Sequence, residues 1–468
     1  MNNKSRYFIK NMGVLTISNF ASKILVFLLV PLYTSVLSTT EYGTYDLVVS
    51  TVALLYPILT ANIVDAVMRF SMDKSCEHKE IAAIGMKYIL IGISVVVVGL
   101  LIISKFRVFK TISGMEIYII AYFISYVLNQ FFLQFAKGLE KIVDMGIAGV
   151  IGTVIMLIAN IVFLLLFKWG LSGFFIANIL AQAVPAIYFF FRLKFWTYLD
   201  EFHINKKLQR DMLIYCLPLI ATALGWWVNN ASDKYIVTFI CGVAANGILS
   251  VSYKIPSIIN VFQGIFTQAW QISAIKEYGD DSTAEFYGNT FLTINVMMSA
   301  ACSWLIILSK PLATILYAKD FYIAWRYVPF LLISSVLNCA SGLLGPILSA
   351  KKDSKSMAMS AVYGAIANII MNILFVYTIG IQGATIATVI ASFIIYAVRK
   401  KAVSKDIIIN GYKVVLITWG LLCIQALLEI YTELLWVQII LMGVMLLINR
   451  YQVKNILKQM KLLCRRRG

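Results

Sequence analysis

The sequence predicts an all-α polytopic membrane protein with about fourteen transmembrane helices. Hydrophobic residues make up 60% of the 468-residue chain and charged residues only 13%, whereas about a quarter of an ordinary soluble domain is charged. The mean hydropathy is +0.84, and apolar runs long enough to cross a bilayer recur from residue 13 almost to residue 448. The strands of a membrane barrel would alternate in segments of about ten residues, so helical spans are expected.

The expected spans follow one another along nearly the whole chain. Windows of about 19 residues place them at 13–35, 44–68, 88–103, 117–135, 147–167, 173–191, 212–240, 246–271, 287–308, 327–348, 358–378, 383–398, 414–430 and 434–449. No small-residue cleavage site follows the first run, and many more spans come after it. We therefore expect a retained helix there rather than a signal peptide.

The basic residues predict the orientation in the membrane. If the N-terminus is cytoplasmic, thirty of the 40 Lys and Arg residues lie in loops on its side and seven on the opposite side. This bias predicts that both termini are cytoplasmic, which requires an even number of spans; twelve would satisfy it as well as fourteen. The net charge of +18 is then explained by membrane topology and anionic lipid rather than by nucleic acid, and the tail at 465–467 is expected to anchor at headgroups.

Several short segments repeat along the chain. GLSGFFIANILA, from Gly170, aligns without gaps on GIQGATIATVIA, from Gly380, at an offset of 210 residues. AKGLEKIVDM, from Ala136, echoes AKKDSKSMAM, from Ala350, and SNFASKI in the first span loosely echoes VNNASDKYI in the seventh. Because six spans separate the copies, the two copies share one orientation. Parallel repeats of this kind place a substrate site near the membrane midplane, between the halves.

The repeat predicts two six-helix lobes around a central cavity. A loop with five basic residues separates the two copies and is expected to be the linker. The predicted organisation is an N-lobe at 1–191, a cytoplasmic linker at 192–211, a C-lobe at 212–398, two further helices at 399–449 and a basic cytoplasmic tail at 450–468.

Two lysines inside the spans are candidate functional residues. Ionisable groups at membrane depth are costly and usually face a bundle interior or a water-filled cavity. Lys23 lies near the middle of the first span, with Asn19 on the same helical face. Lys254 lies about eight residues into the eighth span, flanked by Ser250 and Ser257. We expect both lysines to line the cavity.

The seventh span carries a second polar stripe. Trp226, Asn229, Asn230 and Asp233 follow the i, i+3, i+4, i+7 spacing of one helical face, and Lys234 comes next. These residues are candidates for the polar lining of the cavity. Two alternatives stay open: the amides could hydrogen-bond between helices, and Lys234 could extend to the headgroups from the outer end of the span, which Asp233 would share.

Asp65 and Arg69 are four residues apart near the cytoplasmic end of the second span. This spacing is typical of a local ion pair that would close that end of the helix. The alternative is an inner gate or a proton-linked switch.

No pattern points to a cofactor or a metal. The seven cysteines are scattered and never stand in CxxC spacing, and His78 and His203 lie in polar loops. No GxxxxGK[ST] motif occurs, so the chain has no P-loop for using ATP.

Three segments together resemble a known family. EYGTYDLV at 41–48, LPLIATALGWWVNNASDKYIV from Leu217 and GILSVSYKIPSI from Gly247 are similar to the polysaccharide transporter branch, the flippases of O-antigen and capsule repeat units, of the multidrug/oligosaccharidyl-lipid/polysaccharide exporter superfamily. The resemblance implies a multi-pass protein of the bacterial cytoplasmic membrane whose substrate is an undecaprenyl-pyrophosphate-linked oligosaccharide. It also implies polymerase and other polysaccharide-assembly proteins as partners.

The same resemblance bears on individual residues. In related flippases, cationic residues on the first and eighth helices are thought to hold the pyrophosphate, and Lys23 and Lys254 lie on the corresponding helices here. In some relatives the last helix pair forms a groove for the lipid tail.

Two other functions are compatible with the composition. A multidrug or organic-cation antiporter of the same superfamily would favour acidic cavity residues, for which Asp65 and Asp233 are the candidates. A membrane-bound polysaccharide polymerase, ligase or acyltransferase would need an extended outer loop or a His/Asp/Glu constellation, yet the longest expected outer loop runs only from Ser309 to Arg326.

Overall fold

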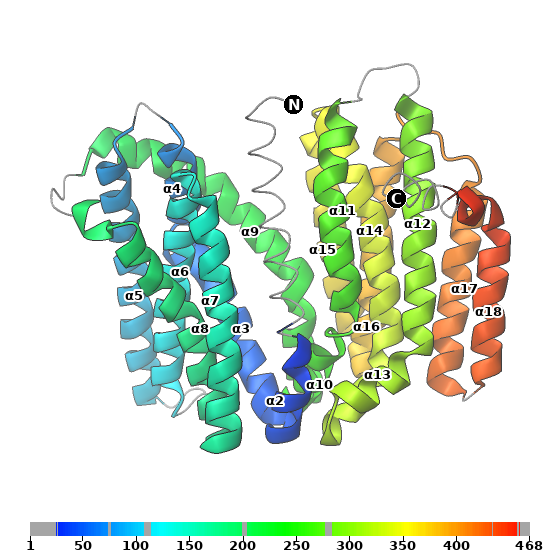
Figure 1. Cartoon of the computed structure of the whole chain (residues 1–468), viewed down its shortest axis with the longest axis horizontal. Coiled ribbons are helices and arrows are strands. Elements are labelled where there is room, and N and C mark those ends of the chain that lie inside the picture. The colour runs from blue at the N-terminus through cyan, green and yellow to red at the C-terminus, as the bar shows by residue number, and fades with distance from the viewer. Residues whose placement is uncertain are drawn as a thin grey trace, which may run out of the picture. The chain divides into compact units, whose positions relative to one another are not determined.

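Every regular element in the described part of the chain is a helix (Figure 1). The computed structural model describes residues 25, 27–73, 76–106, 114–198, 204–276, 283–432, 434–455 and 458. The helices are α2 (Val30–Val36), α3 (Thr39–Leu59), α4 (Ile63–Ser71), α5 (His78–Phe106), α6 (Glu116–Gly138), α7 (Ile142–Asn160), η1 (Ile161–Leu166), α8 (Gly170–Arg192), η2 (Phe195–Tyr198), α9 (Lys206–Cys241), α10 (Val243–Ser252), α11 (Pro256–Lys276), α12 (Thr283–Ile307), α13 (Ser309–Leu316), η3 (Lys319–Tyr327), α14 (Val328–Ala350), α15 (Ser354–Ile379), α16 (Ile381–Ala402), α17 (Tyr412–Tyr431) and α18 (Leu435–Ile448).

The helices confirm a multi-pass membrane protein. Within the described residues, eleven helices are long and apolar enough to cross a bilayer, and α10 and α18 are shorter apolar helices. Most of the predicted first span, 13–35, lies outside the described residues. The helices are thus consistent with the predicted total of about fourteen.

The chain forms two compact units, Met1–Ala231 and Ser232–Gly468, and their boundary falls inside α9. The core of the first unit includes an aromatic cluster in which Phe131, Phe132 and Phe135 of α6 meet Phe195 of η2 nearly edge to face. In the second unit α14 is almost wholly buried and packs against α11, α12, α15, α16 and α17. The lobe limits expected from the sequence stay predictions.

The second predicted span, 44–68, is not one continuous helix. α3 ends at Leu59 and α4 begins at Ile63, because Ala61 and Asn62 adopt left-handed backbone angles, with φ of 50° and 49°. Pro57 lies in the last turn of α3 and has no N–H to donate, which weakens the helical hydrogen bonding at this point. The N–H of Asn62 reaches back five residues to the carbonyl of Pro57 at 2.7 Å.

The eighth predicted span, 246–271, is also interrupted. α10 ends at Ser252, the next three residues form a turn, and α11 begins with Pro256. Proline is favoured at the first position of a helix because its missing N–H would have no partner there. Lys254 therefore lies in a break between two helices, and the prediction that it lies within a continuous span was wrong.

The repeated glycines have the same roles in both units. Gly170 at the start of α8 and Gly380 just before α16 both have positive φ, 53° and 62°, which only glycine adopts without strain. Three residues later, Gly173 and Gly383 let the preceding helix approach closely. A methyl group on Gly173 would lie 3.0 Å from the Cβ of Phe163, and one on Gly383 would lie 2.2 Å from the carbonyl group of Phe375.

The second repeated segment forms the same turn in both units. The turn between α6 and α7 and the turn between α14 and α15 each contain one residue with positive φ, Glu140 at 58° and Lys352 at 60°. In both turns the next residue donates its N–H to the carbonyl five residues earlier at 2.9 Å, which is the usual pattern for ending a helix with a left-handed residue. The two turns correspond at an offset of 212 residues, whereas the alignment of Ala136 on Ala350 has an offset of 214, so the local structure repeats but the predicted register was wrong by two residues.

Replacing Gly383 by alanine should lower the stability of the protein. The added methyl group would overlap the backbone of Phe375, and overpacking of this kind typically costs about 1–3 kcal/mol. Gly420 of α17 is the matched control, since nothing lies within 4 Å of a methyl group placed there and alanine is favoured over glycine in a helix by up to about 1 kcal/mol. Thermal unfolding in detergent should show a lower midpoint for Gly383→Ala than for Gly420→Ala; equal midpoints would contradict the close packing.

Candidate functional site

Asp233 is the buried carboxylate of the candidate site in the second unit. It lies on α9 with only 4% of its surface exposed. The hydroxyl of Tyr253, in the break between α10 and α11, donates a hydrogen bond to its Oδ2 at 2.5 Å. A buried carboxylate requires such donors because removal from water disfavours its charge. This hydrogen bond connects the break between α10 and α11 to α9.

Lys254 follows Tyr253 in the same break. Its N–H donates to the carbonyl of Val251 at 2.9 Å, and its carbonyl accepts from the hydroxyl of Ser257 at 2.5 Å. Ser250 is buried and hydrogen-bonds Asn246. The two serines that flank Lys254 thus serve the local backbone and α10, and the lysine side chain is half-buried.

An amide cluster links α9 to α15. The hydroxyl of Ser232 donates to Oδ1 of Asn368 at 3.0 Å, and Nδ2 of Asn372 donates to the same oxygen at 3.0 Å. Asn368 and Asn372 are both buried. Polar side chains commonly hold membrane helices together in this way. Sequence reasoning missed both asparagines, although their i, i+4 spacing in an apolar span was visible.

The asparagines of the predicted stripe bond to their own helix. Asn229 donates to the carbonyl of Gly225 at 3.0 Å, and Asn230 donates to that of Trp226 at 2.6 Å. These bonds stay within α9. They differ from the bond between Ser232 and Asn368, which joins α9 to α15. Asn230 and Trp226 are exposed, Trp226 at 66%.

Trp227, which the sequence offered beside Trp226 as an aromatic partner for sugars, has a structural contact. Its indole N–H donates to the carbonyl of Ser50 in α3 at 2.8 Å. The two neighbouring tryptophans therefore differ, since Trp227 joins two helices of the first unit while the ring of Trp226 is open to contact.

The spacing of Asp65 and Arg69 does not produce the expected ion pair. Asp65 accepts a hydrogen bond from Nδ2 of Asn62 at 2.7 Å, while Arg69 is exposed. The salt bridges found among described residues join Arg192 to Asp144 and Lys351 to Asp406. Asp65 thus stabilises the break between α3 and α4, and a gating role stays a prediction.

Three predicted residues remain, on the first span and on α9. Lys23 and Asn19 lie outside the described residues, so their roles stay predictions. Lys234 is half-buried, and its carbonyl accepts from the hydroxyl of Thr238 at 2.6 Å.

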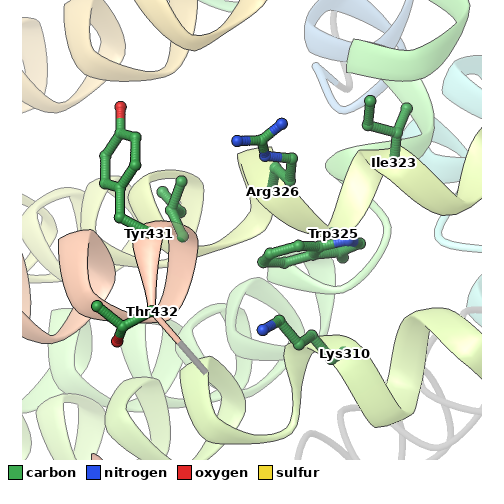
Figure 2. A pocket seen from close by; sticks show the side chains of 7 residues that line it. Lys310, Ile323, Trp325, Arg326, Tyr431 and Thr432 are labelled. Carbon is green, nitrogen blue, oxygen red and sulfur yellow. The ribbon is translucent and has the colours of Figure 1, made fainter. Parts of the chain in front are cut away.

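A cationic pocket of about 370 Å³ lies elsewhere in the second unit, where α13 and η3 meet the end of α17. Figure 2 shows the Lys310 ammonium group beneath the ring of Trp325, with Arg326 and Tyr431 extending on the other side in this view. The Lys310 nitrogen is 4.6 Å from the ring centroid, a favourable cation–π distance. The sequence identified these cations only as outer-loop charges.

The chain matches the model of the family described as polysaccharide biosynthesis protein over residues 8–272. A search among functionally curated proteins found no significant match. These results rest on sequence and are independent of the helix arrangement.

Solved structures of similar fold are transporters and flippases. A lipid II flippase, MurJ, in an inward closed conformation has 16% identity and a TM-score of 0.66, with 95% of this chain and 99% of that chain covered. An inward-facing MATE family multidrug resistance transporter of the MOP superfamily has 14% identity and a TM-score of 0.64, covering 83% and 98%. A MOP superfamily transporter from Pyrococcus furiosus, described as having a binding pocket of reversed polarity, has 14% identity and a TM-score of 0.58, covering 84% and 96%. At these identities the likeness establishes the fold.

Replacing Trp227 by phenylalanine should destabilise the first unit by about 1 kcal/mol, because the carbonyl of Ser50 loses its interhelical donor. Trp226→Phe is the matched control, since this ring is exposed. Thermal unfolding of both variants in detergent checks the difference. If the two variants unfold at the same temperature, the indole bond does not contribute to stability.

Proposed function

The chain belongs to the polysaccharide biosynthesis protein family, and from this premise we propose that it is a flippase for undecaprenyl-pyrophosphate-linked oligosaccharide repeat units. It would move them across the bacterial cytoplasmic membrane, with both of its termini in the cytoplasm, for assembly into O-antigen or capsule by a polymerase and its partner proteins. The family match over more than half of the chain is the observation that carries this proposal. The similar fold of a lipid II flippase supports it.

The cations of the first and eighth spans suit a pyrophosphate. An anion that leaves water needs positive charge nearby to offset its desolvation. We assign this role to Lys23 and Lys254. Lysine is a flexible point charge, whereas arginine grips an anion through two parallel hydrogen bonds. Two lysines would therefore hold the headgroup loosely enough to release it.

The sugars would meet the polar face of α9. Trp226 offers an exposed ring, and the side-chain oxygen atoms of Asn229 and Asn230 can accept from hydroxyl groups while their nitrogens stay bonded to α9. Asp233 and Lys234 extend this polar face. The open ring and amides support a role in sugar binding.

Movement would use the helix breaks. The breaks at 60–62 and 253–255 interrupt two spans, and interrupted helices mark the moving and binding parts of many transporters. Asp65 and Arg69 follow the first break, in α4, and are our candidates for the inner gate. Without a P-loop, the driving force would be an ion gradient, the membrane potential or removal of product outside.

A multidrug or organic-cation antiporter is the second candidate. The buried carboxylate of Asp233 is the observation that favours it, because an acidic group at membrane depth can bind a cation or a proton. A MATE transporter also shares the fold. The polymerase or ligase alternative gains no support from the similar structures, which are flippases and transporters.

Lys254→Ala and Lys23→Ala should each abolish translocation while leaving the protein in the membrane, since each removes a charge that offsets desolvation of the pyrophosphate. A leaflet-specific assay with lipid-linked oligosaccharide in proteoliposomes measures this. Lys355→Ala is the control, because Lys355 is exposed in the first turn of α15. Full activity of both cavity variants would overturn the pyrophosphate assignment.

The antiporter alternative is tested by drug resistance and by the amount of surface polysaccharide. If overexpression confers drug resistance that Asp233→Asn removes, and deletion leaves surface polysaccharide unchanged, the chain is an antiporter and the flippase proposal fails.

A further inference from the structure

A second cationic cavity, of about 440 Å³, lies between α5 and the start of α9 in the first unit. Its lining from α9 follows the spacing of one helical face. The lining residues are Lys87, Lys206, Gln209, Arg210, Leu213, Ile214 and Leu217. Three cations thus occupy one end of the cavity and three aliphatic side chains the other, and no carboxylate lines it.

The cationic end is built from hydrogen bonds between the two helices. Gln209 donates from Nε2 to the hydroxyl of Tyr88 at 2.8 Å, and its Oε1 accepts from Nζ of Lys87 at 3.3 Å. Gln209 thereby holds Lys87 of α5 beside α9. The nearby carboxylate of Glu80 accepts from Asn205 at 3.3 Å and is not part of the lining. Lys87 and Gln209 are thus held by hydrogen bonds, and the exposed Lys206 and Arg210 lie on the same face of α9 as Gln209.

The other end of the cavity is apolar and open. Ile214 is 56% exposed and Leu217 is 65% exposed. On α5, Leu90 and Ile91 follow Lys87 by three and four residues, so they share its face, and both are exposed. Exposed aliphatic side chains on two spanning helices are suited to contact with lipid chains. The cavity therefore presents cations beside a lipid-compatible surface.

We propose that this cavity is a docking site for the pyrophosphate headgroup of the lipid-linked substrate, with the start of its polyprenyl chain along Leu213, Ile214 and Leu217. The inference rests on the proposed function. Charge complementarity favours a pyrophosphate over a common phospholipid, because a pyrophosphate diester carries one more negative charge than a phosphate diester and three cations converge here. The distribution of basic residues predicts that this end of α9 lies on the cytoplasmic side, where the proposed substrate would be gathered. The site would gather substrate from the membrane before transport.

Removing two of the cations should weaken the affinity for the pyrophosphate lipid by about tenfold or more. Each basic side chain near an anionic lipid raises the affinity by a factor on the order of ten or slightly less. The variant is Lys206→Ala with Arg210→Ala; both side chains are exposed, which favours normal folding. The probe is undecaprenyl pyrophosphate without sugar, measured by native mass spectrometry on protein in phosphatidylcholine nanodiscs. Lys207→Ala is the matched control, because Lys207 is the exposed neighbour on the same turn and does not line the cavity.

Three outcomes decide the proposal. Weak binding by the double variant, with normal binding by Lys207→Ala and by the charge-conserving Lys206→Arg with Arg210→Lys, supports it. Equal binding by the double variant and the unaltered protein overturns it. Equal affinity of the unaltered protein for phosphatidylglycerol also overturns it, because the cavity would then be a general anionic-lipid site.

Failure of the proposed function would look different. The unaltered protein would bind the pyrophosphate lipid at this site and yet not translocate lipid-linked oligosaccharide in proteoliposomes. That result would support the docking site and contradict the flippase proposal.

Discussion

Close contact between helices is the constraint on which this structure depends. Lipid tails solvate an apolar side chain as well as another helix does, so the hydrophobic effect does not hold spanning helices together. They associate through close packing and hydrogen bonds. Gly173 and Gly383 supply the packing, since the preceding helix lies where their side chains would be. Trp227 supplies an interhelical bond in the first unit, and Asn368 accepts one in the second.

The helix breaks satisfy a second demand of the bilayer, which is that no polar backbone group is left without a partner. At the first break the carbonyl of Asn62 accepts from the thiol of Cys216 at 3.3 Å, and its side chain bonds Asp65. At the second break Tyr253 bonds Asp233. A break of this kind is stable only where neighbouring helices provide such groups. Both breaks coincide with the charged residues that the sequence identified as candidates.

The sequence predicted the helical class and the local repeat because both depend on short, periodic signals. The glycines at 170 and 380 are required by backbone geometry, so they recur at the offset that the alignment found. Pro57 and Pro256 indicated possible bends, but the spans were drawn as continuous, because a window of about 19 residues averages hydropathy and does not detect a three-residue turn. Asn229 and Asn230 show another limit. Their spacing identifies a polar face, but each side chain bonds its own helix, and spacing alone does not choose between that bond and a partner helix.

The charges of the second unit bear on the proposed pyrophosphate site, because such a site must also release its anion. In the proposed function Lys254 would attract a phosphate, while its neighbour Tyr253 donates to the buried carboxylate of Asp233, whose negative charge would oppose the same anion. The hydrogen bond from Tyr253 stabilises the charged form of Asp233 and disperses part of its charge. With this carboxylate in the same unit, Lys254 would bind the proposed pyrophosphate less tightly than a lysine without such a neighbour would. Since a flippase would need a site that releases its substrate, the carboxylate that Tyr253 holds would favour turnover in the proposed function, and the same carboxylate is the observation that favours a cation antiporter as the competing function.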